Sequence, residues 1–196
     1  ANPISEPKYW GQADTEFTRL RIRSTDEAFM IERLNFYNVS DTKADVLANV
    51  DQIKLTYTNK AGQTLTSTGS FNQDVRPSVS FGFTGDNRPY IPKDSSADII
   101  LTALMKTKGG GATSEVNFAI DFSGGVNDEF RAVGEGSGTV IEGATSGNTI
   151  TDLDGNNMYV YRAFPKIEQV SLAGSAPTGT KDVLKFKITA MGLADS

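Results

Sequence analysis

Hydrophobic and polar residues alternate along most of this chain, in short runs separated by Gly, Pro, Asn and Asp. Alternation with a period of two places one face of a β-strand in a core and the other in solvent. Runs of this kind cover residues 17–24, 29–39, 53–58, 64–71, 78–84, 97–105, 116–122, 158–164, 167–172 and 183–190. Roughly a dozen short strands, with no stretch typical of a long helix, predict an all-β sandwich of the jelly-roll or Greek-key kind.

Two of these runs are predicted to form the centre of the core. Residues 97–105 are the most continuous apolar run, which is typical of a central strand. The run 116–122 has apolar side chains at every second position, namely Val116, Phe118, Ile120 and Phe122. We expect a single returning strand there, packed against residues 97–105.

The last run has one apolar face and one largely basic face. Val183 precedes a strict alternation in which apolar and polar side chains take turns: Leu184, Lys185, Phe186, Lys187, Ile188 and Thr189. A strand with one apolar face needs a sheet to lie on, and too few residues follow Ile188 to form another strand. We therefore expect this strand to pair backwards into its own sheet or sideways with another molecule.

The same alternation occurs near the start of the chain. Leu20-Arg-Ile-Arg23 matches Phe186-Lys-Ile-Thr189 in its pattern. The chain thus ends with a segment similar to its own opening strand. This is expected of one repeat cut from a head-to-tail array, and equally of a subunit whose tail completes its neighbour.

Residues 1–14 lack periodicity, and we interpret them as an N-terminal arm. Pro residues in this segment fix the backbone and remove ladder donors. Tyr9 and Trp10 either pack against their own domain or contact a neighbouring subunit. After the arm we expect a sandwich domain at residues 15–164 and an extension at residues 165–196, beginning where Pro165 bends the chain. Either terminal segment can be the donated strand.

Composition and charge exclude several functions. With 19 Lys and Arg against 24 Asp and Glu, the net charge is −5, so no global positive field attracts nucleic acid. No apolar run approaches the length needed to span a bilayer. The chain has no Cys and no His. Thiol nucleophiles, imidazole bases and the usual zinc sites are therefore ruled out, and we predict no enzyme activity and no cofactor.

Two motifs are candidate ligand or modification sites. Asp152, Asp154 and Asn156 place side-chain oxygens at alternate positions, as calcium loops do, but the later positions of an EF-hand loop do not match. A tight turn is the alternative interpretation. Asn38-Val-Ser40 has the pattern of a glycosylation acceptor.

The first residue is Ala1 rather than Met, and we expect export through a cleaved signal peptide to the cell surface or the extracellular space.

Three segments resemble the immunoglobulin-like repeats of large bacterial cell-surface proteins. They are Tyr161-Arg-Ala-Phe-Pro165, Asp182 to Ala190, and the step Tyr90-Ile-Pro-Lys93 before the strand at residues 97–104. In such repeats the first segment resembles a module boundary and the second the opening of the next module. The resemblance implies an immunoglobulin-like sandwich and surface architecture rather than chemistry.

We therefore predict a structural subunit of an extracellular, pilus-like filament that polymerises with itself by strand donation. The predicted subunit interface consists of Val183, Leu184, Phe186, Ile188, Trp10 and Tyr9. The alternative is a carbohydrate- or ligand-binding module of a larger adhesin or surface-layer protein. An exposed aromatic platform built from Trp10, Tyr9 or Tyr90 would favour that alternative.

Overall fold

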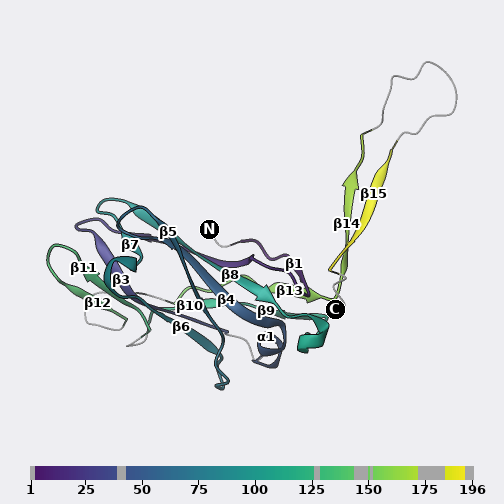
Figure 1. Cartoon of the computed structure of the whole chain (residues 1–196), viewed down its shortest axis with the longest axis horizontal. Coiled ribbons are helices and arrows are strands. Elements are labelled where there is room, and N and C mark those ends of the chain that lie inside the picture. The colour runs from purple at the N-terminus through teal and green to yellow at the C-terminus, as the bar shows by residue number, and fades with distance from the viewer. Residues whose placement is uncertain are drawn as a thin grey trace, which may run out of the picture.

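The computed structural model describes residues 3–38, 43–125, 129–143, 150, 152–171 and 184–192. These residues form an elongated β-rich body, and a two-stranded hairpin projects from one end of it (Figure 1). Several antiparallel sheets pack around one apolar core. The all-β sandwich predicted from the sequence is thereby confirmed.

One layer of the body is a four-stranded antiparallel sheet in the order β2-β8-β4-β5. Its strands are β2 (Thr15–Arg23), β8 (Ser96–Met105), β4 (Val50–Thr58) and β5 (Thr64–Gly69). The turn between β4 and β5 is closed by Asn59, whose N–H donates to the Gln63 carbonyl at 3.0 Å and whose Oδ1 accepts the Gln63 N–H at 2.9 Å. In this sheet β2 and β5 are the two edge strands.

The second layer is built around β3 (Phe29–Tyr37). Residues near the end of β3 pair with both β10 (Asp121–Ser123) and β6 (Ser78–Gly82), so these two strands lie on opposite edges of β3. The start of β3 pairs in the same way with β11 (Arg131–Gly134) and β7 (Tyr90–Ile91). Strand β12 (Val140–Glu142) lies outside β11.

A small third sheet joins the N-terminal arm to the body. Strand β1 (Pro7–Tyr9) pairs parallel with β13 (Met158–Tyr161), and β13 pairs antiparallel with β9 (Val116–Phe118). The helix α1 (Lys43–Asn49) precedes β4, and short 3-10 turns occupy Gly85–Asn87 and Lys108–Gly110. No helix among the described residues is long and apolar enough to cross a membrane.

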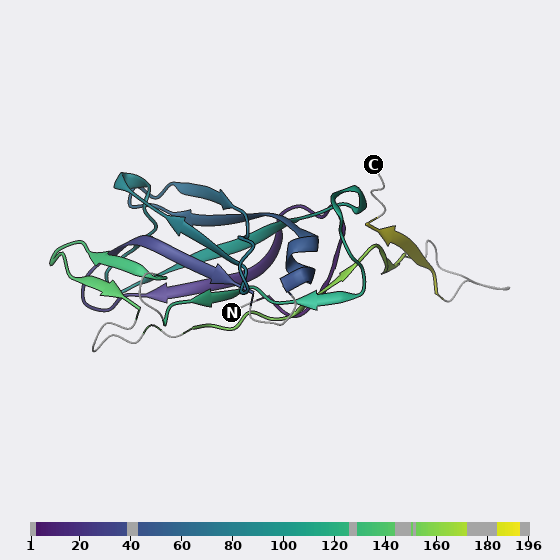
Figure 2. The same ribbon diagram turned by 90° about the horizontal axis from the view of Figure 1, so that it is seen from below.

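Aromatic rings pack against one another within the second of the two layers, which Figure 2 shows stacked face to face. Phe36 contacts Phe81 and Phe122 with ring centroids 6.2 and 6.0 Å apart, and Phe122 contacts Phe130 at 6.0 Å. All three pairs are edge-to-face, the arrangement in which the positive edge of one ring meets the negative face of the other.

Two expectations from the sequence are wrong in detail. The run 116–122 is not a single strand, because the chain leaves the small sheet after β9 and enters the second layer at β10. The apolar alternation from Val116 to Phe122 nevertheless continues across this corner between the two sheets. Pro165 does not bend the chain out of a strand but lies within β14 (Phe164–Gln169). Pro is tolerated there because β14 is an edge strand.

Candidate functional site

The projecting hairpin consists of β14 and β15 (Phe186–Met191), which pair antiparallel with Ile167 opposite Ile188. The predicted C-terminal strand thus pairs backwards, but onto its own neighbouring strand rather than into the body. Among the described residues, β14 and β15 pair only with each other. Both views show the hairpin extending beyond the end of the body (Figures 1 and 2). Val183 lies outside the described residues.

One face of the hairpin is apolar and exposed to solvent. It carries four large side chains whose exposed fractions are 61% for Leu184, 56% for Phe186, 59% for Ile188 and 66% for Ile167. Opposed and alternate residues of a β-hairpin share a face, so these side chains form one continuous strip. An exposed strip of this kind is a candidate interaction site, because monomeric soluble domains rarely expose large contiguous apolar patches. We call it the apolar strip.

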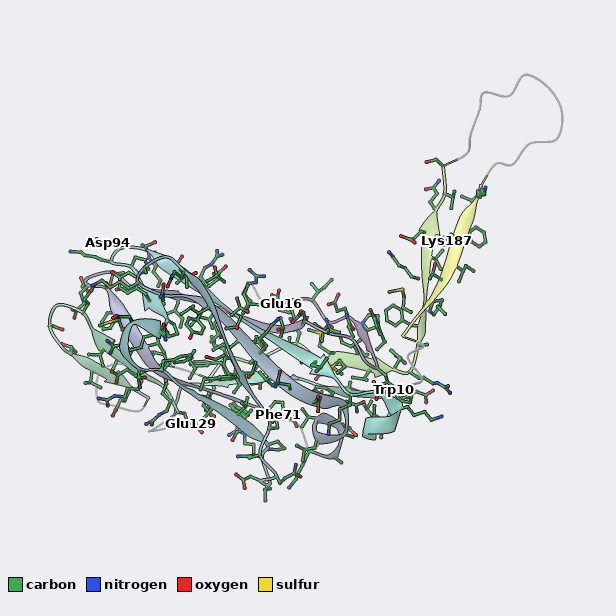
Figure 3. All side chains as sticks on the ribbon, viewed as in Figure 1. Trp10, Glu16, Phe71, Asp94, Glu129 and Lys187 are labelled. Carbon is green, nitrogen blue, oxygen red and sulfur yellow. The ribbon has the colours of Figure 1, made fainter. Side chains whose placement is uncertain are left out.

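The opposite face of the hairpin is charged. It carries Lys166, Glu168, Lys185 and Lys187, and Lys187 stands clear of the body in Figure 3. Lys166 Nζ lies 2.8 Å from Glu168 Oε1. This ion pair lowers the pKa of Glu168. The charged face keeps the hairpin hydrated while the apolar strip is unpartnered.

The base of the hairpin is held by Tyr9. The Tyr9 ring packs against Phe164 of β14 with centroids 5.8 Å apart. Next to it, Gly192 has a φ of +96°, and a Cβ at this position would come within 2.6 Å of Tyr9 Cβ and 2.8 Å of the Arg162 carbonyl oxygen. Only Gly fits this conformation and this close approach. Tyr9 therefore contacts its own hairpin.

Trp10 lies in the core of its own body. Its Nε1 donates to the Thr113 carbonyl at 3.2 Å, and its ring belongs to the buried apolar cluster. A subunit contact through Trp10 stays a prediction, and the burial leaves little of the ring available for it. Trp10 and strand β7, which carries Tyr90, lie at opposite ends of the body (Figures 1 and 3). The two residues therefore do not form a common aromatic platform.

The backbone of β15 presents an open edge. The Val170 N–H donates to the Lys185 carbonyl at 2.8 Å, so residues 170 and 185 face each other across the hairpin. In an antiparallel pair, the backbone groups of successive residues point alternately toward the partner strand and away from it. The N–H and C=O groups of Phe186, Ile188 and Ala190 therefore point away from β14. The outward groups of β14 belong to Pro165, Ile167 and Gln169. Pro165 has no N–H, so the β15 edge is the more complete of the two.

The predicted calcium loop makes internal hydrogen bonds. Asp152 Oδ1 accepts the backbone N–H groups of Gly124 at 3.0 Å and Gly125 at 2.9 Å, and the Gly124 bond contributes most to lowering the pKa of Asp152. Asn156 Nδ2 donates to the Pro3 carbonyl at 2.8 Å. Asp154 lies between them in the sequence. Among the described residues, no group of three or more acidic side chains is placed to hold a metal ion.

Asp121 is a buried carboxylate that the sequence pattern did not single out. Its side chain is 1% exposed, and its Oδ1 accepts the Gly155 N–H at 2.7 Å. Its Oδ2 is buried without a hydrogen-bond partner among the described residues. The pKa of Asp121 is raised to about 6, mainly by burial and in smaller part by the negative charges of Asp154 and Asp152, while the hydrogen bond from Gly155 and the charge of Arg76 act against this rise.

Asn38 is buried as well. Its Nδ2 donates to the Ala119 carbonyl at 2.9 Å. Val39 and Ser40, which complete the glycosylation pattern, lie outside the described residues. Attachment of a glycan would require this hydrogen bond to break and the Asn38 amide to reach solvent. Glycosylation at this position stays a prediction.

A broad concave region lies on the outer face of the β2-β8-β4-β5 sheet. It has a volume of about 650 Å³ and is lined in part by Arg21, Asp98, Thr56 and Tyr90. Arg21 donates two hydrogen bonds to Asp98, at 2.7 and 2.9 Å, which lower the pKa of Asp98. The Tyr90 hydroxyl donates to Glu135 at 3.0 Å. In this region a predicted aromatic residue, Tyr90, lines a concave surface together with polar and charged side chains.

The sequence predicted the apolar residues of β15 but not their partner strand or the role of Tyr9. The alternation at residues 167–172 was visible, yet no local signal indicated that β14 and β15 would pair outside the body. Comparison of the chain with protein-family models, with curated proteins and with solved structures gives no significant match. The function is therefore inferred from the site alone.

Proposed function

We propose that this chain is a structural subunit of an extracellular, pilus-like filament, in which the hairpin of one copy adds to a sheet of the next. The observation that carries the proposal is the apolar strip on a hairpin that projects from the body. Addition of a strand to a sheet edge supplies main-chain hydrogen bonds, while alternate side chains fill an apolar surface. The contact joins two different surfaces and can repeat as open head-to-tail growth.

The free energy available from the strip is large enough for assembly. Burying a large apolar side chain contributes about 2 kcal/mol, so Leu184, Phe186 and Ile188 together contribute about 6 kcal/mol before the cost of association. Ile167 adds to this sum, as do the hydrogen bonds of the β15 edge. The hairpin is already formed in the single chain, which reduces the entropy lost on binding.

The N-terminal arm is a weaker candidate for the donated element. Strand β1 pairs with β13 of its own body, and Trp10 is part of its own core. Donation of the arm would require these contacts to break first. The C-terminal hairpin makes no strand pairing with the body among the described residues, so its donation has no such cost.

The proposal is tested by two matched double variants. Phe186→Ser/Ile188→Ser removes side chains from the apolar strip, whereas Lys185→Ser/Lys187→Ser changes the charged face of the same strand. We expect the wild-type chain and the charged-face variant to form filaments in negative-stain microscopy and light scattering, and the apolar-strip variant to stay monomeric. A wild-type chain that stays monomeric at all concentrations would contradict the proposal.

A second candidate function is the binding of a carbohydrate or another polar ligand in the concave region that contains Tyr90. The observation in favour is a concave surface in which Tyr90 lies among polar and charged side chains that can hydrogen-bond to a ligand. Calorimetric titration of oligosaccharides into wild type and Tyr90→Ala tests it. Binding that is lost in Tyr90→Ala while filaments are absent would favour this function over assembly.

A further inference from the structure

If the hairpin is donated, a second copy must offer an unpaired strand edge beside an apolar surface. Strand β2 meets both requirements. It is an edge strand of the four-stranded sheet. A groove of about 260 Å³ lies beside it, between the two layers, lined mainly by apolar side chains that include Leu20, Ile22, Phe122, Phe130 and Leu153. We propose that β15 of one copy pairs in parallel with β2 of a second copy and covers this groove.

The backbone of β2 shows which of its groups are open. The Ser24 N–H donates to the Ser95 carbonyl at 3.0 Å, so residue 24 faces β8. By alternation, Ile22 and Leu20 also direct their backbone groups to β8, whereas those of Arg21 and Arg23 point away from the sheet. The open edge of β2 therefore presents the N–H and C=O groups of Arg21 and Arg23, which alternate with Leu20 and Ile22, the residues whose side chains face the groove.

Only a parallel pairing lets the open edges of β15 and β2 form hydrogen bonds while the apolar strip lies on the same face of the sheet as the groove. In an antiparallel pair, residues with open groups lie opposite each other, so Ile188 would lie opposite Arg21 on the solvent face. In a parallel pair, the N–H and C=O of a residue such as Arg21 do not bond to the residue directly opposite on the other strand. They bond to the residues immediately before and after that opposite residue. Arg21 then lies opposite Lys187. Phe186 and Ile188 lie beside Leu20 and Ile22, on the face that lines the groove.

The apolar strip would cover apolar side chains that are exposed beside β2. Leu153 is 48% exposed and lies at the groove, while its backbone bridges to Phe122 on the edge of β10. Phe186 and Ile188 would cover the groove itself, and Ile167, on the next strand of the added hairpin, would extend the covered surface. The added hairpin continues the sheet in the order β14-β15-β2-β8-β4-β5.

At the other edge strand of this sheet, β5, Thr64 lines the concave region on the outer face, on the side away from the core. The inner side of β5 packs on β6, where a Cβ on Gly69 would come within 2.7 Å of the Val79 side chain. The open groups of β5 belong to its outward threonines, such as Thr66. A hairpin added at β5 would leave its apolar strip without a partner surface.

Charge favours the pairing of a hairpin with another body. The described hairpin has three lysines and one glutamate, which give it a net charge of +2. Because the whole chain has a net charge of −5, the rest of the chain has a net charge of −7. Opposite net charges steer two copies into head-to-tail rather than hairpin-to-hairpin contact. Locally, the register places Lys187 opposite Arg21 and Lys185 opposite Arg19. Asp98 already compensates Arg21, and Glu16 compensates Arg19, each through two hydrogen bonds.

Disulfide cross-linking between two separately purified variants tests the proposal, since the chain has no Cys of its own. Lys187→Cys is mixed with Arg21→Cys, and in parallel with Thr66→Cys as the matched control on β5. All three positions are exposed. One partner carries a mass tag, copper phenanthroline oxidises the thiols, and the mixed dimer is measured on non-reducing gels. Far-UV circular dichroism checks that each variant is folded.

This inference rests on the proposed function, and the outcomes separate the two. We expect at least tenfold more mixed dimer with Arg21→Cys than with Thr66→Cys. If filaments form but the cross-link prefers Thr66→Cys, or forms with neither, the assignment of β2 is wrong while strand donation stands. If the wild-type chain forms no filaments and neither mixture cross-links, the proposed function itself is wrong.

Discussion

Ile167 and Ile188 lie directly opposite each other in the projecting hairpin, and each side chain is more than half exposed. A cross-strand pair of this kind stabilises the hairpin by less than about 1 kcal/mol, because most of its surface stays in water. Burial of the same pair by a second copy would contribute several times more. The pair is thus better suited to an interface than to the fold of the single chain.

The first prediction concerns Ile167. Ile167→Ser removes one apolar side chain from the strip and is expected to raise the critical concentration for filament formation about ten- to thirtyfold, since about 1.5–2 kcal/mol of burial is lost. The melting temperature of the body should not change, because Ile167 does not contact the core. Sedimentation at a series of protein concentrations measures the first quantity and circular dichroism the second. Lys166→Ser on the charged face is the control and should leave both unchanged.

The second prediction concerns the base of the hairpin. Tyr9→Ala removes the ring that packs on Phe164, a contact worth about 1 kcal/mol. Amide hydrogens of β14 and β15 should therefore exchange about five- to tenfold faster, which mass spectrometry of peptic fragments measures. Tyr159→Ala, at an exposed position of β13, is the control. Equal exchange in both variants would show that Tyr9 does not hold the hairpin.

Much of the fold follows from the period-two pattern alone. The strands at residues 53–58 and 97–105 were predicted within one to three residues of β4 and β8, because each has one buried face and lies between clear turn residues. The run 116–122 could not be assigned correctly. Its apolar alternation continues across the corner between β9 and β10, so the pattern contains no sign of the change of sheet.

The candidate site was predicted only in part. The alternation of Leu184, Phe186 and Ile188 identified an apolar strand face, since this information is local. The strands β14 and β15 are consecutive, but whether such a hairpin docks on the body or projects from it depends on packing rather than on pattern. Asp121 could not be recognised either, because the alternation places it on the solvent face of a single strand that does not exist.

The third prediction distinguishes a structural role of Trp10 from an interface role. Trp10→Ala should lower the free energy of unfolding by about 3–5 kcal/mol, because a buried ring and its hydrogen bond to Thr113 are lost. Urea unfolding of the monomeric Phe186→Ser/Ile188→Ser background measures this cost without interference from assembly. Trp10→Phe keeps most of the packing and should leave filament formation by the otherwise wild-type chain intact. Loss of filaments in a fully folded Trp10→Phe variant would instead place Trp10 at the subunit contact.

The last prediction concerns pH. Asp121 has a pKa of about 6 in the folded chain, against about 3.9 when unfolded, so the folded state binds the extra proton between these values. The charged form is disfavoured in the fold, and the free energy of unfolding should therefore rise, by about 1–3 kcal/mol, as the pH falls from 7 to about 4.5. Asp152 and Asp98 have lowered pKa values, so their stabilising contributions are lost only below about pH 4.

Urea unfolding between pH 7 and pH 4.5 checks whether the free energy of unfolding rises or falls as the pH is lowered. Asp121→Asn should flatten the rise, whereas Asp94→Asn, at an exposed position, should keep it. A stability that falls steadily from pH 7 to pH 5 in the wild-type chain would contradict the burial of an unpaired Asp121 oxygen.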